Sequence, residues 1–138
     1  KIAGFCERRR ENFRNIYNRL VELGAEKYFI LPEASENADP SWFGFLLTCR
    51  EGIDRNRVVQ FLEEKNIQTR MLFAGNLIKH PCFDQMRSSN TGFRIVDELV
   101  NTDRIMNDSF WFGVYPGIDE KKINYITKSL MEAVNSLK

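Results

Sequence analysis

The chain has 138 residues, with 20 lysines and arginines against 19 aspartates and glutamates. A chain of this length forms one domain and buries about two-thirds of its unfolded surface, so we expect a full hydrophobic core. The net charge of +1 gives no overall attraction to nucleic acid, and no apolar run approaches the roughly 20 residues of a membrane span. We therefore expect neither nucleic acid nor a membrane among the partners.

The cysteines indicate the cellular compartment of the protein, and the first residues indicate whether the sequence is part of a longer chain. Cys6, Cys49 and Cys82 are odd in number and widely separated, which suits neither a disulfide framework nor a CxxC metal site. Reduced thiols and a cytoplasmic protein are expected. The sequence opens without Met and without a signal-peptide pattern, at the start of a predicted helix. We expect a fragment, residues 1–138, that forms a single small domain of a longer enzyme.

Two helices are predicted in the first half of the chain. Apolar residues recur at helical spacing over 13–23, and Gly24 suits the end of that helix. Asp54 stands where an N-cap belongs, before a second apolar stripe that ends near Asn66. The run 8–10 is three arginines between glutamates, which indicates a solvated helix face, with interdomain or phosphate contacts as the alternative.

Four segments have the composition of strands: 27–31, 42–49, 68–73 and 109–114. The second is rich in aromatic and aliphatic residues and should lie at the centre of the sheet. Residues 74–100 are irregular and predict a long loop, mobile unless braced by another domain or subunit. Asn101 or Thr102 could cap a short helix through Met106, and Asp119 should open a final helix with apolar residues at 123, 126, 130, 134 and 137. This order predicts an α+β fold, with helices packed on a small, mostly antiparallel sheet.

Motifs for self-contained catalysis are missing from the sequence. His80 is the single histidine, the serines lack a nucleophile motif, and no glycine-rich phosphate loop is present. Aspartates 54, 103, 108 and 119 stand at predicted helix starts or loop ends, where capping explains them. We expect no catalytic residue and no metal site in this chain.

Candidate binding residues cluster after the third strand and in the short helix that follows the long loop. Phe73 ends a strand directly before Gly75 and Asn76, where an aromatic is either core or ligand contact, and where the backbone and amide could face a ligand or a partner subunit. Arg104 could pair with a carboxylate or hold a diphosphate or sugar hydroxyls. Arg70 could reach a ligand or a neighbouring subunit, or be solvated or ion-paired.

Segments 39–45, 69–77, 101–106 and 110–117 together carry a family resemblance. The chain resembles the C-terminal small domain of sugar-nucleotide 3-dehydratases in the pyridoxal-phosphate-dependent sugar aminotransferase superfamily, of fold type I. It is most similar to the CDP-4-keto-6-deoxyglucose 3-dehydratases. The resemblance implies an enzyme that removes the C3 hydroxyl of a CDP-4-keto-6-deoxyhexose in deoxysugar biosynthesis, for the O-antigen of lipopolysaccharide.

The resemblance also implies cofactors and partners. The parent enzyme would use pyridoxamine or pyridoxal phosphate and a two-iron two-sulfur cluster, held by residues upstream of this chain. Its partners would be the upstream large domain, a second subunit of a homodimer, a reductase and the CDP-sugar. Phe73 would face the cofactor pocket, where aminotransferases of the superfamily tend to carry a polar or imidazole side chain. The fragment alone should be inactive and bind no cofactor.

Three alternatives stay open at this point. One is a sugar-nucleotide aminotransferase domain. Another is a non-enzymatic α+β module that binds nucleic acid or a small ligand on its sheet through Phe43, Phe45, Trp111 and Phe112, although the nearly continuous apolar strands argue for burial. The last is a domain retained only for oligomer contacts.

Overall fold

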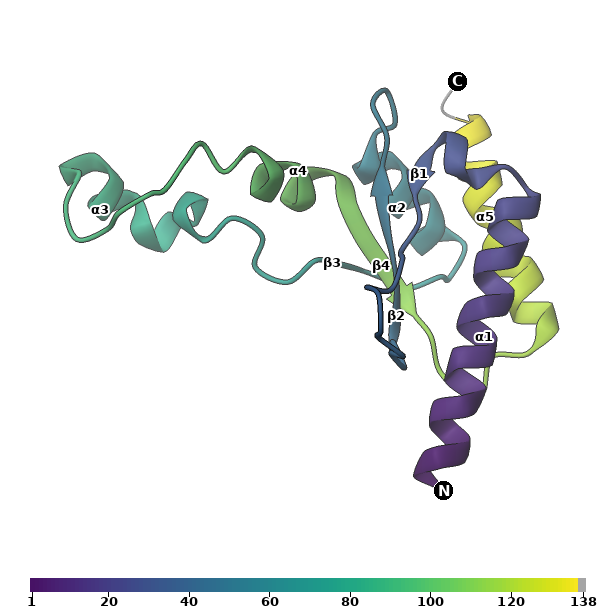
Figure 1. Cartoon of the computed structure of the whole chain (residues 1–138). Coiled ribbons are helices and arrows are strands. Elements are labelled where there is room, and N and C mark those ends of the chain that lie inside the picture. The colour runs from purple at the N-terminus through teal and green to yellow at the C-terminus, as the bar shows by residue number, and fades with distance from the viewer. Residues whose placement is uncertain (137–138) are drawn as a thin grey trace.

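The computed structural model describes residues 1–136 and has an α+β fold (Figure 1). The strands are β1 (Phe29–Ile30), β2 (Gly44–Cys49), β3 (Thr69–Met71) and β4 (Ser109–Gly113). The α-helices are α1 (Ile2–Glu22), α2 (Arg55–Glu64), α3 (Asp84–Ser89), α4 (Val100–Asp108) and α5 (Glu120–Ser136). All strand pairs are antiparallel in the order β1-β2-β4-β3, so the predicted fold class and the interior place of β2 are confirmed.

One face of the sheet forms the core. Along β2, Phe45, Leu47 and Cys49 are buried, while the residues between them are half-buried on the other face. Phe45 stacks on Phe112 across the strand pair with ring centroids 5.4 Å apart. Helix α5 packs against both α1 and α2 on this side. The opposite face is left open by these three helices.

Local signals fix the ends of the three long helices. Gly24 has φ +72° just past α1, and the Asp54 carboxylate accepts a hydrogen bond from the Asn56 N–H at 2.8 Å. Asp119 does the same for the Lys122 N–H at 2.8 Å before α5. These predicted boundaries are confirmed. The expected apolar position 137 lies outside the described residues.

The predicted cap of α4 is wrong. The helix begins at Val100 with Leu99 in the left-handed conformation as its N-cap, and no side chain caps it. Asn101 and Thr102 therefore lie inside the first turn. Asp103, expected as a cap, binds side chains from the segment after β3.

Residues 72–99, here called the arm, project from the side of the sheet and return through α4 (Figure 1). The arm is not wholly irregular, because it contains α3 and two 3₁₀ turns at 77–79 and 81–83. The strand before it is also shorter than predicted, since β3 ends at Met71. Mobility of the arm stays a prediction.

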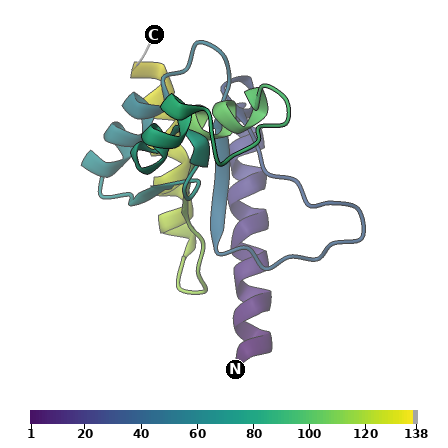
Figure 2. The ribbon, with the colours of Figure 1, turned by 90° about the vertical axis from the view of Figure 1, so that its left-hand side faces the viewer.

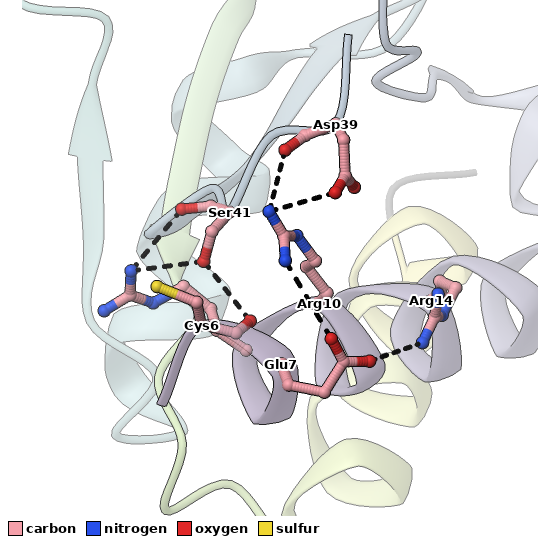
Figure 3. A network of polar contacts seen from close by, with 7 residues as sticks. Cys6, Glu7, Arg10, Arg14, Asp39 and Ser41 are labelled. Carbon is pink, nitrogen blue, oxygen red and sulfur yellow. Dashed lines mark hydrogen bonds and ion pairs between the residues drawn. The ribbon is translucent and has the colours of Figure 1, made fainter. Parts of the chain in front are cut away.

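The loop over residues 31–43 bulges beside α1 and is tied to it by arginines (Figures 2 and 3). Arg10 donates to the Asp39 backbone oxygen and pairs with its carboxylate, both at 3.0 Å. Arg9 reaches the backbone oxygen of Ser41 at 3.4 Å, and the Ser41 hydroxyl donates to the Cys6 carbonyl at 3.4 Å. The solvated-face interpretation is therefore wrong for Arg9 and Arg10, which hold this loop in place.

Candidate functional site

A hollow of about 450 Å³ lies on the open face of the sheet. That volume is within the range of small-molecule sites. Its wall comes from β2, β4, the 31–43 loop and the first residues of the arm: Pro32, Glu33, Trp42, Phe43, Gly44, Leu46, Leu72, Phe73 and Trp111. The lining is apolar and aromatic, and Glu33 is its one charged side chain. Such a surface suits the face of a sugar or a flat ring, with Glu33 available as an acceptor.

Trp111 forms the floor of the hollow and depends on Gly44. A Cβ at Gly44 would lie 2.6 Å from the indole Cε3, so a larger residue there would push the ring away. Phe43 meets Trp111 edge to face, with centroids 5.4 Å apart. The indole N–H donates to the Met71 backbone oxygen at 3.2 Å. This hydrogen bond ties the floor to the chain just before Phe73.

Phe73 stands at the edge of the hollow in a sharp turn. Its side chain is 76% exposed and its φ is +48°, which is unusual for a bulky residue. The turn is closed by hydrogen bonds from the Phe73 N–H to the Met71 oxygen and from the Gly75 N–H to the Leu72 oxygen. Within residues 1–136, Phe73 is therefore not part of the hydrophobic core, and the contact with a ligand stays a prediction. An exposed aromatic on a strained backbone is a feature of binding sites.

Gly75 and Asn76 face inward rather than outward. Gly75 has φ +64°, and a Cβ there would lie 2.4 Å from Cγ of Met106. The Asn76 side chain is 2% exposed, and its Nδ2 donates to an Asp103 carboxylate oxygen at 2.9 Å. The expectation that Asn76 presents its amide to the sugar nucleotide or a partner subunit is wrong, because that amide is buried and donates to Asp103 of α4.

Both arginine candidates are exposed, and Arg70 interacts electrostatically with the Glu63 carboxylate. Within residues 1–136, the side chains of Arg70 and Arg104 make no hydrogen bond or ion pair. Arg70 pairs with Trp111 across the strands, on the open face of the sheet, and Arg104 lies on α4 beside Asp103. Phe73 and Trp111 therefore share the hollow, whereas neither arginine lines it.

The contacts of Asp103 and Arg55 could not be predicted from the sequence, because their partners lie far away along the chain. Asp103 acts on residues 24 and 27 positions earlier, and no local pattern joins them. Arg55 of α2 donates to the Asn107 oxygen at 2.9 Å and so holds the end of α4. The alternation along 44–49 could have indicated an open face, because Gly44 and Thr48 stand on one side of the strand and Phe45 and Cys49 on the other.

The cysteines form no reactive or metal-binding cluster in the part of the chain that the structure describes. All three are free, and no group of three or more metal-ligating side chains gathers among residues 1–136. Burial raises the pKa of the Cys49 thiol to about 12, with the nearby Asp108 carboxylate adding to the rise. Across the same residues no helix is long and apolar enough to cross a bilayer.

The chain matches the model of a known protein family. The model of the DegT/DnrJ/EryC1/StrS aminotransferase family matches residues 1–131. The chain belongs to this family. The resemblance to sugar aminotransferases and dehydratases is thereby confirmed at the family level.

Two curated relatives are each 43% identical to the chain. One is the lipopolysaccharide biosynthesis protein RfbH of Salmonella typhimurium, matched over 134 residues, 96% of this chain and 29% of the relative. The other is the dTDP-4-dehydro-2,6-dideoxy-D-glucose 3-dehydratase of Saccharopolyspora spinosa, matched over 136 residues, 97% of this chain and 28% of the relative. The chain thus spans less than a third of the length of these relatives.

Solved structures of similar fold include dehydratases and aminotransferases. The E coli GDP-4-keto-6-deoxy-D-mannose-3-dehydratase with bound hydrated PLP superposes with a TM-score of 0.76 at 20% identity, over 94% of this chain and 32% of that one. An aminotransferase from Psychrobacter cryohalolentis gives 0.75 at 16% identity, over 96% and 35%. These likenesses show a shared fold and do not separate the two activities.

Proposed function

We propose that this chain is the C-terminal domain of a nucleotide-sugar 3-dehydratase and forms one wall of its sugar pocket. The observation that carries the proposal is Phe73, an exposed aromatic in a left-handed turn at the edge of an aromatic hollow. Support comes from the relative at 43% identity that is named a 3-dehydratase. The CDP nucleotide, and a place in O-antigen biosynthesis, are finer parts of the same proposal.

The chemistry of the reaction would come from residues outside this chain. Pyridoxal phosphate is held in its enzymes by a lysine and by a charged partner of its ring nitrogen. The hollow has no lysine in its lining and only one carboxylate, Glu33, so it does not fit the complete cofactor. No reaction step is assigned to these residues. The proposed iron-sulfur cluster would likewise need ligands from elsewhere, because Cys6, Cys49 and Cys82 do not gather.

The role proposed for this chain is to shape the pocket. Phe43, Phe73 and Trp111 would pack on the sugar and exclude water from its C3 and C4. Arg104, exposed and unpaired, would approach the diphosphate with its planar fork. Partners of the chain would be the upstream domain, a second subunit and the reductase.

A substitution pair in the full-length protein tests this proposal. Phe73→His should change turnover or the partition between dehydration and transamination while the melting temperature stays nearly constant, because Phe73 is solvent-exposed. Arg104→Lys keeps the charge but loses the fork, so KM should rise with little change in stability. Arg57→Lys, an exposed arginine on α2, serves as the matched control. Wild-type kinetics in both variants would refute the proposed site.

The alternatives differ in what they require. A sugar-nucleotide aminotransferase is favoured by the description of the family model, and amino transfer by the wild-type protein in place of dehydration would identify it. A binding module that uses four sheet aromatics is disfavoured, because Phe45 and Phe112 are buried in the core. Of these four aromatics, only Phe43 and Trp111 lie on the open face of the sheet.

A further inference from the structure

The two ends of the arm meet at Asp103. One carboxylate oxygen of Asp103 accepts from Asn76 Nδ2 at 2.9 Å, and the other accepts from Lys79 Nζ at 2.7 Å. Asn76 and Lys79 lie where the chain leaves β3, and Asp103 lies where it returns through α4. This pair of contacts, here called the clasp, closes the arm at its base.

Packing at the same point supports the clasp independently. Met106 lies three residues after Asp103 and therefore on the same side of α4. Its side chain occupies the space that a Cβ of Gly75 would need, and its sulfur faces the Asn76 N–H at 3.3 Å. Since Asn76 is 2% exposed, its amide has no water to replace Asp103.

The clasp residues lie close in sequence to the two side chains assigned to the ligand. Phe73 is three residues before Asn76, and Arg104 follows Asp103 on the helix. We propose that Asp103 is a positioning residue, which sets the directions of Phe73 and Arg104 by holding Asn76 and Lys79 against α4. The ligand named here rests on the proposed function, whereas the clasp is a property of this chain.

The charge state and exposure of the clasp determine how it should be tested. The hydrogen bond from Lys79, and to a smaller extent the one from Asn76, lowers the pKa of Asp103, so the carboxylate is ionised at neutral pH. Lys79 is half-exposed, and an ion pair of this kind adds little to global stability. Loss of the clasp should therefore loosen the base of the arm without unfolding the sheet.

Hydrogen exchange on the full-length protein measures this directly. Asp103→Asn should speed exchange of the Gly75 and Asn76 backbone amides by about tenfold or more, while amides of β2 and β4 stay unchanged. Glu98→Gln removes an exposed carboxylate from the same arm and should leave exchange at the wild-type rate. Unchanged exchange in Asp103→Asn, or an equal increase across the sheet, would overturn the proposal.

A charge exchange supplies the rescue. Asp103→Lys alone should loosen the arm, and adding Lys79→Glu should restore most of the protection, because opposite charges face each other again. Asn76 can turn its amide oxygen toward the new lysine and accept its hydrogen bond. A double variant no better protected than Asp103→Lys would count against the clasp.

Kinetics of the full-length protein separate this inference from the proposed function. If both hold, Asp103→Asn raises KM for the nucleotide sugar, and the charge-exchanged pair lowers it again. If the function fails, Phe73 and Arg104 variants leave turnover unchanged while the exchange effect remains. If the clasp fails, those variants still alter turnover and Asp103→Asn behaves as wild type.

Discussion

Gly75→Ala places a methyl group where α4 passes the base of the arm. The added Cβ would lie 2.4 Å from Cγ and 3.0 Å from Cβ of Met106, atoms near the root of that side chain. Met106 cannot clear the space by rotating only its terminal methyl group. The helix or the turn must shift, and both carry the contacts of Asp103.

Two costs add at this position. An alanine at φ +64° loses roughly 1 kcal/mol through the left-handed backbone. Overpacking against a fixed neighbour adds about 1 to 3 kcal/mol. We expect Gly75→Ala to lower the free energy of unfolding by about 2 to 4 kcal/mol. For a chain of this size, each kcal/mol lowers the melting temperature by about 4 °C.

Gly52→Ala separates the two costs. Gly52 has φ +84°, but nothing lies within 4 Å of its added Cβ, so only the backbone term applies. Urea denaturation of both variants should give a larger loss for Gly75→Ala, and adding Met106→Ala to it should recover part of the difference. Equal losses for the two glycine variants would refute the close approach of α4 to the arm.

Three further outcomes follow from other parts of the chain. Hydrogen bonds from the Thr69 hydroxyl and N–H lower the pKa of Glu63, so the ionised Glu63 stabilises the fold above the ordinary glutamate pKa of 4.5, and this stabilisation is lost as pH falls through the lowered pKa. Acid titration should therefore destabilise the wild type more than Glu63→Gln. Parallel curves of unfolding free energy against pH for the two proteins would contradict this. A thiol reagent at neutral pH should label exposed Cys82 and spare Cys49, whose pKa burial raises to about 12, and mass spectrometry of the labelled peptides decides it. Limited proteolysis of the chain should cut first near 88–92, and first cuts within the long helices would contradict the predicted mobility of the arm.

The sequence by itself determined the three long helices and the positions of the four strands along the chain. Gly24, Asp54 and Asp119 act on backbone groups within three or four residues, so their effect is local and visible in the chain. The apolar stripes of α1, α2 and α5 could be predicted for the same reason, since each stripe follows the helical period. The family resemblance also rested on contiguous segments of sequence.

The tertiary structure decided how the site is built. Phe73 and Leu99 adopt positive φ, which no composition of their neighbours requires, and these turns end β3 early and start α4 at Val100. Asn76 is covered because Asp103 and Met106 arrive from the far end of a long arm. Contacts between residues so far apart depend on how loops close around the sheet, and that balance of loop entropy against packing is absent from any local pattern.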